Sequence, residues 1–273
     1  MSSCLLTKSV RLLVLAFLPI WAGYAAAAGG PCSVTLADLR CEYLKDPLGI
    51  DVQQPRLSWQ LVAAEPAARG QKQTAYRILV ASTKALLDED KGDLWDSGEV
   101  ASDQSAHVVY TGKPLGSGAS CFWKVRAKDQ AGATSAWSAP ARWTMGLLER
   151  SDWSARWIGT DQVFTRQRSG GDMVPDPWLR KTFELKARCE TAVIYVASVG
   201  YHEVYVNGKR IGDAVLSPAV ANHRKRARYV AYEIADQLQE GRNVIALWLG
   251  VSWSIFPPYK TDQETPKIGR AHV

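Results

Sequence analysis

Short stretches in which apolar and polar residues alternate recur along the chain from about residue 34 onward, and long stretches of helical period are nearly absent. In the clearest of them, residues 123–128, an apolar residue at every odd position alternates with a lysine or arginine at every even one. This period is typical of a strand with one face in a core and the other in water. We therefore expect Lys124, Arg126 and Lys128 to face solvent. Residues 83–87 give the one hint of a helical turn in the first half.

The strand patterns predict an all-β protein made of two consecutive β-sandwich domains. About seven short strands within about 110 residues, separated by Gly and Pro, are typical of such a domain. We expect the first sandwich over residues 33–146 and the second over residues 147–262. In the second, Asn207-Gly208 predicts a type I′ hairpin turn, because both turn residues must accept a positive φ. Residues 243–249 are apolar on both faces, as in a central strand.

The first 28 residues have the pattern of a secretory signal peptide. Lys8 and Arg11 precede an apolar run over residues 12–21, which is too short to span a bilayer, and a run of alanines over residues 25–28 suits cleavage. An uncleaved signal anchor is the alternative, but no stop-transfer pattern follows. We expect an exported protein, periplasmic or secreted, with no membrane segment after cleavage.

Four cysteines remain after the signal peptide: Cys32, Cys41, Cys121 and Cys189. Their number is even, but they lack the close pairing of zinc ligands. Three disulfide pairings are possible, and buried free thiols are an equally open alternative.

Composition and charge describe an ordinary globular protein. The 273 residues are 47% hydrophobic and 22% charged, which excludes wholesale disorder and a polytopic membrane protein. The net charge is +6, and the densest basic run is residues 222–228. Nucleic-acid binding needs a broader basic patch, so we expect this run to be a solvated hairpin end and expect no nucleic-acid partner.

The first sandwich resembles a known family through an ordered series of short motifs. These are RCEYL at 40–44, DPLGID at 46–51, PRLSW at 55–59, QTAYRILV at 73–80, LWDSG at 94–98, WKVR at 123–126, and Trp137-Ser138. The series resembles the fibronectin-type-III-like domain that opens bacterial α-L-rhamnosidases. Trp59, Trp95 and Trp123 are then expected in its core.

The second sandwich resembles the N-terminal β-sandwich domain of the same family, which is jelly-roll-like. The matching residues are GYHEVYVNGK at 200–209, LSP at 216–218, Tyr232, Leu238 and EGRNV at 240–244. Together the two resemblances cover about residues 36–260. One departure is local: the family commonly has Gly-Trp after Leu249-Gly250, whereas Ser252 precedes Trp253 here.

The resemblance implies a parent enzyme that hydrolyses terminal α-L-rhamnose. The family uses an inverting pair of carboxylates, about 6.5–9.5 Å apart, in a helical (α/α)6 barrel that follows these domains. Because no such helical pattern is present, we assign no catalytic residue, metal ligand or cofactor and expect the chain alone to be inactive. The acidic run at residues 88–90 is expected to be solvated loop charge.

The last residues suggest that the parent protein continues. Residues 263–273 are expected to be a tail, and IGRAHV at 268–273 resembles one reading frame of a common sequencing adapter. A genuine tail is the alternative. It would suit a second class of function, a stand-alone exported carbohydrate-binding or adhesion protein.

Candidate sugar-binding residues are aromatic or lie on the hairpin. Sugars stack their C–H faces on Trp and Tyr, and the chain has 11 Trp and 10 Tyr against 5 Phe. We select Trp253 and Tyr259 in the C-terminal loop, with Tyr205 and Asn207 on the hairpin. For Trp253 and Tyr259 the alternative is packing against the absent barrel, and for Asn207 it is the turn itself. The expected partners are rhamnose-containing glycosides, met through the parent enzyme, and the missing catalytic domain.

Overall fold

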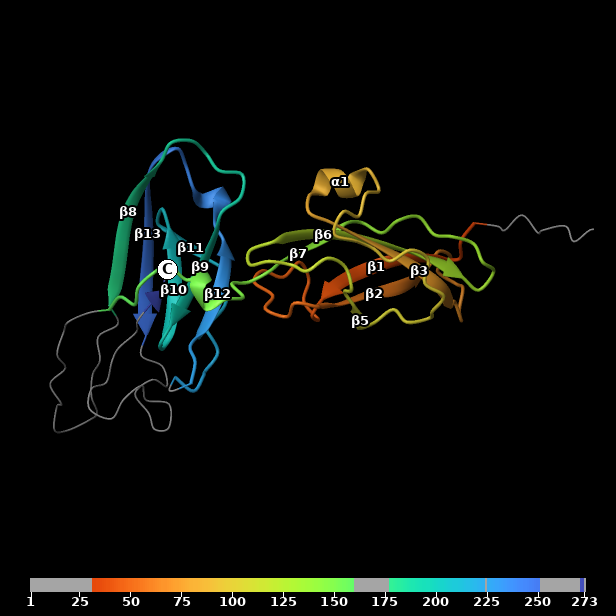
Figure 1. Ribbon diagram of the computed structural model, residues 1–273, viewed down its shortest axis with the longest axis horizontal. Helices are drawn as coiled ribbons and strands as arrows, with labels where there is room; N and C mark the ends of the chain where they lie inside the picture. The colour runs from red at the N-terminus through yellow and green to blue at the C-terminus, as the bar shows by residue number, and fades with distance from the viewer. Residues whose placement is uncertain (1–30, 160–176, 224, 251–270, 273) are drawn as a thin grey trace, which may run out of the picture.

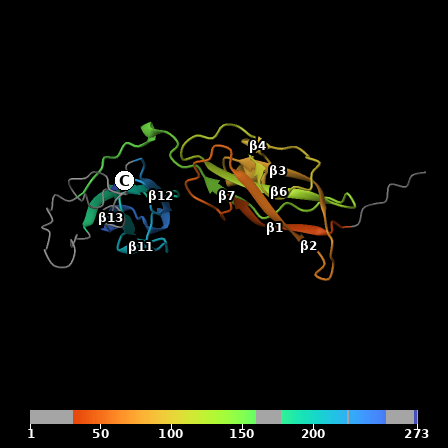
Figure 2. The ribbon, with the colours of Figure 1, turned by 90° about the horizontal axis from the view of Figure 1, so that it is seen from below.

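A computed structural model describes residues 31–159, 177–223, 225–250 and 271–272. The predicted signal peptide lies outside the described residues. The described chain forms two β-sandwiches that lie end to end along the long axis of the molecule (Figures 1 and 2). The predicted fold class, all-β with two consecutive sandwiches, is confirmed. No helix among these residues is long and apolar enough to cross a bilayer.

The first sandwich consists of a three-stranded and a four-stranded antiparallel sheet. The smaller sheet has the order β1 (Val34–Cys41), β2 (Arg56–Ala63), β5 (Val108–Val109). The larger has the order β4 (Trp95–Asp96), β3 (Gln73–Ala81), β6 (Ser120–Asp129), β7 (Ala141–Thr144). The two sheets enclose one apolar core, which contains the predicted Trp59 and Trp123. Trp95 is only partly buried and packs at the edge of that core against Tyr110.

Lys124 corrects the prediction for the outer face of β6, because its side chain is buried and not in solvent. The residue is only 8% exposed. Helix α1 (Lys84–Asp88), capped by the Thr83 hydroxyl, covers this face of the sheet and buries Leu87. The Lys124 ammonium donates to the Leu87 carbonyl at 2.6 Å and pairs with the Asp90 carboxylate. Asp90 is exposed, as expected for this acidic run, but its carboxylate also pairs with the buried lysine of the sheet.

The second sandwich also consists of two antiparallel sheets. Its four-stranded sheet has the order β11 (Lys209–Ile211), β10 (Tyr201–Val206), β13 (Gly241–Gly250), β8 (Trp178–Leu185). Its three-stranded sheet has the order β12 (Arg228–Glu233), β9 (Val193–Ser198), β14 (Ala271–His272). Ala271 and His272, assigned to the tail from sequence, thus pair with Ser198 and Ala197. β13 is central, as predicted.

The predicted hairpin turn joins β10 to β11. Asn207 and Gly208 have φ of 50° and 82°, as a type I′ turn requires. Asn207 also ties this turn to β13, because its side-chain oxygen accepts from the Val244 amide at 2.8 Å. Its side-chain nitrogen donates to the Gln237 carbonyl and to Asn243. The turn therefore fixes the end of the four-stranded sheet.

The two sandwiches meet through the outward face of β12 and β9. Tyr229 accepts a hydrogen bond from the Leu147 amide at 3.2 Å, and its ring packs against Trp153 of the connector. Arg142 of the first sandwich donates to both carboxylate oxygens of Glu233. These contacts hold the two domains in a defined arrangement.

Glycine is required where the two sandwiches approach most closely. A Cβ on Gly146 would lie 2.0 Å from the Tyr229 hydroxyl, and one on Gly49 would lie 3.1 Å from the Ala231 methyl carbon. A side chain at Gly146 requires Tyr229 to shift, and one at Gly49 makes a tight contact with Ala231 in addition to a strained positive φ of 73°.

The four cysteines within the described residues, Cys32, Cys41, Cys121 and Cys189, carry free thiols. Cys41 and Cys121 are both buried in the first core. Burial raises the pKa of the Cys121 thiol to about 12. Such a thiol is inert at neutral pH, because the thiolate is the reactive form. Of the alternatives left open by the sequence, the structure therefore has buried and partly buried thiols.

Candidate functional site

Three aromatic side chains gather on the outer face of the four-stranded sheet of the second sandwich. Trp178 of β8 and Trp248 of β13 are directly paired across the two strands, and their rings stack 4.9 Å apart with an interplanar angle of 18°. Tyr205 of β10 approaches Trp178 at 5.4 Å. Trp178 is 56% and Trp248 39% exposed. We call Trp178, Tyr205 and Trp248 the aromatic face.

Charged groups on the same sheet border the aromatic face. The Tyr205 hydroxyl donates to Glu203 at 2.7 Å, and Arg210 pairs with the other Glu203 oxygen at 3.1 Å. The hydrogen bond to Glu203 raises the pKa of Tyr205 above its usual value. Arg210 is fixed in turn by a bond to the Ala214 carbonyl. The solvent-exposed aromatic face thus has an oriented carboxylate and an oriented guanidinium at its edge.

A cavity of about 180 Å³ opens beside the aromatic face. Trp248 and Glu203 form one part of its wall, and Val215, Leu216 and Ser217 form another. Val215 and Leu216 are strongly exposed. Pockets with mostly apolar walls and a few oriented polar groups are typical of small-molecule sites. The aromatic face and this cavity together are the candidate binding surface of the second sandwich.

His202 also borders this cavity, but its ring is buried and both ring nitrogens are engaged. Its Nδ1 contacts the Ser198 hydroxyl at 2.7 Å and its Nε2 contacts the Tyr232 hydroxyl at 3.0 Å. The His202 side chain and Ser198 are buried, and burial lowers the pKa of His202 to about 4. A Ser–His contact can activate a nucleophile only where substrate can reach the serine. This group is therefore a neutral network that joins the two sheets.

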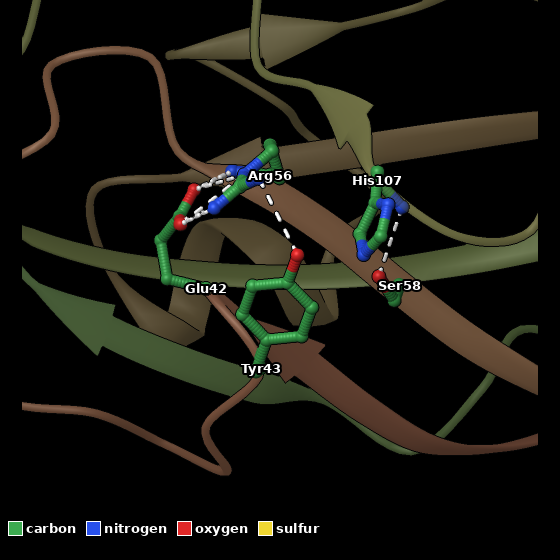
Figure 3. Close-up of polar contacts among 5 residues, drawn as sticks. All are labelled: Glu42, Tyr43, Arg56, Ser58 and His107. Atoms are coloured by element: carbon green, nitrogen blue, oxygen red, sulfur yellow. Dashed lines mark hydrogen bonds and ion pairs between the residues drawn. The ribbon is translucent and has the colours of Figure 1, made fainter.

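A second polar cluster lies on the first sandwich, shown in Figure 3. The Glu42 carboxylate accepts from the Arg56 guanidinium and from the Arg56 backbone amide at 2.6 Å. The guanidinium lies over the Tyr43 ring, whose edge meets His107, and the His107 amide donates to Ser58. The hydrogen bond from Arg56 lowers the pKa of Glu42.

The chemistry of this cluster is structural. A carboxylate that an arginine holds ionised cannot deliver the proton that glycoside cleavage needs. Glu42, Tyr43 and His107 all have φ between 47° and 68°, and the ion pair and ring contacts hold them in that left-handed conformation. The cluster therefore fixes the turn after β1.

Within the described residues, no group of three His, Cys, Asp or Glu side chains is arranged to hold a metal ion. The described carboxylates with lowered pKa owe the shift to hydrogen bonds with Arg, Lys or Ser or with backbone amides. Each of these carboxylates is thus held in its ionised form by neighbouring hydrogen-bond donors.

The predicted site residues have different outcomes. Trp253 and Tyr259 lie outside the described residues, and Tyr205 lies on the aromatic face. Asn207 lies at the hairpin end, where its side-chain groups are engaged with Gln237, Asn243 and Val244. Their roles in sugar binding stay predictions.

Sequence reasoning missed Trp178 and Trp248. Trp248 lies in an apolar run that predicted burial on both faces of the strand. Because tryptophan is itself apolar, the pattern did not indicate that its face of the sheet is exposed to solvent. The useful signal was strand parity: β10 places Glu203 and Tyr205 outward, and Glu203 is the register partner of Trp248.

Comparison with known proteins gives these domains their family. Residues 36–149 match the model of the Rha78A-like N-terminal immunoglobulin domain. Residues 187–269 match the model of the alpha-L-rhamnosidase N-terminal domain. The two sandwiches of this chain are thus the Ig-like and N-terminal domains of the α-L-rhamnosidase family. The family resemblance found in the sequence is confirmed.

Curated and solved relatives agree. An alpha-L-rhamnosidase of Formosa agariphila is 35% identical over 239 residues, 80% of this chain and 25% of the relative. One from Streptomyces avermitilis is 34% identical over 221 residues, 76% of this chain and 21% of the relative. The solved alpha-L-rhamnosidase from Dictyoglumus thermophilum superposes with a TM-score of 0.76 at 31% identity, over 86% of this chain and 26% of that one.

The chain thus spans about a quarter of the length of the relatives it matches. The shared part contains the N-terminal domains of those relatives. The agreement among relatives favours an accessory region over the alternative of a stand-alone adhesion protein.

Proposed function

We propose that this chain is the accessory region of an exported α-L-rhamnosidase that removes terminal α-L-rhamnose from glycosides. In the parent enzyme an inverting pair of carboxylates, contributed by a downstream helical barrel, breaks the bond. The residues of this chain bind and position. The proposal includes the signal peptide at residues 1–28 and a periplasmic or secreted location, for which the sequence pattern is the support.

The observation that supports the proposal is the aromatic face, which lies on the sandwich that matches the α-L-rhamnosidase N-terminal domain. An exposed stack of Trp178 and Trp248 is costly to leave in water and suits the apolar C–H face of a sugar ring. Glu203 and Arg210 stand beside it as an acceptor and a donor for the ring hydroxyls. Aromatic rings with a few placed polar groups are what a saccharide requires.

The test is titration of the purified chain with L-rhamnose and a rhamnose disaccharide, followed by tryptophan fluorescence and calorimetry. We expect weak binding that the double substitution Trp178→Ala/Trp248→Ala lowers at least tenfold. Trp157→Ala is the matched control, because Trp157 is also about half exposed but lies in the connector. Unchanged binding by the double variant would refute the assignment of the face.

A further inference from the structure

A second concave surface lies between the two sandwiches and has no part in the account above. It is a cleft of about 390 Å³, within the range of about 300–1,000 Å³ typical of ligand sites. The first sandwich contributes residues 48, 49 and 51, and the second contributes residues 226–231. We call it the cationic cleft. It includes the end of the basic run that the sequence singled out.

The walls of the cationic cleft are held in place by the domain interface. Tyr229 and Ala231 line the cleft and also make the interface, through the Leu147 amide and the close approach of Gly49. Glu233, at the end of the same strand β12, pairs with Arg142 of β7 in the first sandwich. The cleft is therefore preformed, and a ligand would meet fixed walls.

Two arginines of the cleft are unpaired. Arg226 and Arg228 are exposed, and within the described part of the chain neither guanidinium has a hydrogen-bond or ion-pair partner. By contrast, Arg56 and Arg77 of the first sandwich each bind a carboxylate. The carboxylate of Asp51 also lines the cleft without an ion pair to either arginine. The cleft thus offers two guanidinium donors and one acceptor.

We propose that the cationic cleft binds the anionic group of an acidic saccharide, a uronate carboxylate or a sulfate ester. Guanidinium groups match the planar oxygens of such anions with paired hydrogen bonds. Asp51 repels any anion equally, but its carboxylate accepts hydrogen bonds from the hydroxyls that every sugar ring carries beside its anionic group. An acidic protein segment offers such hydroxyls only at Ser, Thr or Tyr, which favours a saccharide. The inference rests on the proposed function for the saccharide nature of the ligand, and names acidic rhamnose-containing glycans as the substrate class.

The experiment is calorimetric titration of the full chain with three oligosaccharides of equal length. One is made of glucuronic acid, one is a sulfated rhamnose oligosaccharide, and one is its uncharged counterpart. We expect an acidic probe to bind, with an affinity that falls as salt rises, and the uncharged probe not to bind at this cleft. The two acidic probes distinguish a carboxylate from a sulfate as the natural anion.

Two double variants locate the binding. Arg226→Gln/Arg228→Gln should weaken the acidic probe at least tenfold. Lys186→Gln/Arg188→Gln removes the same charge from an exposed turn between β8 and β9 and should leave the affinity unchanged. Equal loss in both variants would show nonspecific attraction and overturn the proposal. So would failure of both acidic probes to bind, which would leave the cleft to an acidic segment of a protein.

The result is separable from the test of the aromatic face. The glucuronate probe contains no rhamnose, so its binding does not depend on rhamnose recognition. Trp178→Ala/Trp248→Ala should lose binding of rhamnose and keep binding of the glucuronate probe. Arg226→Gln/Arg228→Gln should lose binding of the glucuronate probe and keep binding of rhamnose.

Discussion

At the scale of single residues, Asp129 shows how one buried carboxylate joins the start of the chain to the end of β6. It accepts from the Ser33 amide and hydroxyl, both at 2.8 Å, and from the amides of Ala131 and Ala133. These bonds, from Ser33 first, lower the pKa of Asp129 to about 2. Asp129→Asn turns one acceptor into a donor and should cost about 1–3 kcal/mol of unfolding free energy.

Urea unfolding at pH 7 measures this cost. Asp103→Asn is the control, because its side chain is exposed, and such changes usually stay within about 0.5 kcal/mol. The carboxylate contributes stability above its unfolded pKa of about 3.9, and this is lost as the pH falls toward 2. A loss equal to that of the control would contradict the role of Asp129.

His202 gives the second prediction at this scale. Burial lowers its folded pKa to about 4, whereas the unfolded value is about 6.5. The unfolded state therefore binds the proton more readily, so stability is full above about pH 6.5 and falls as the pH drops toward 4. The loss should be about 3 kcal/mol, at about 1.4 kcal/mol per pH unit.

The check is an NMR titration of the His202 ring together with urea unfolding from pH 7 to pH 4. His202→Gln keeps a polar group for Ser198 and Tyr232 but removes the titration, so its stability should depend less on pH in this window. A ring that titrates near pH 6.5 in the folded protein would contradict the burial argument.

Some residue roles could not be predicted because their partners are far apart in sequence. Lys124 obeys the alternation of a solvent-facing position, yet its acceptor carbonyl on Leu87 lies 37 residues away, and only the folded sheet brings α1 over it. The cores around Trp59 and Trp123 were predictable, because period-two patterns report directly which face is buried.

At the scale of elements, the hairpin turn between β10 and β11 depends on Asn207 for both conformation and bonding. Asn207→Ala must keep φ near 50° and loses the bonds to Gln237, Asn243 and Val244. It should destabilise the second sandwich by about 1–3 kcal/mol. Asn207→Gly relieves the strain of the positive φ and loses only the side-chain hydrogen bonds. Its stability should therefore lie between that of the unchanged protein and that of Asn207→Ala.

Thermal unfolding of the three proteins tests the ranking. If Asn207→Ala kept full stability but lost rhamnose binding, Asn207 would belong to the sugar site and not to the turn. Asn-Gly between two strands predicted this turn from sequence alone. The hydrogen bonds from Asn207 to Gln237 and to β13 could not be predicted, because the local sequence pattern does not indicate the order of strands in the sheet.

At the scale of the whole molecule, the arrangement of the two sandwiches depends on small residues at their contact. Gly146→Ala would place a methyl group 2.0 Å from the Tyr229 hydroxyl, so the Tyr229 side chain or the domain that carries it must shift. We expect a broader range of interdomain arrangements in small-angle scattering and unfolding in two steps. Gly116→Ala is the control, since its Cβ would meet nothing within 4 Å.

Identical scattering profiles for Gly146→Ala and Gly116→Ala would show that this contact does not fix the domains. The sequence predicted two sandwiches, but not this interface. A contact between Gly146 and Tyr229 depends on two surfaces whose complementarity no periodicity reveals.

The central claim is that this chain is the positioning region of a rhamnosidase whose bond-breaking residues lie elsewhere. The most direct measurement is hydrolysis of an aryl α-L-rhamnoside by the purified chain and by the longest reading frame at its source locus. The account predicts no turnover by the chain and turnover by the longer protein. Turnover by the 273-residue chain alone, abolished by a substitution within its two sandwiches, would contradict it.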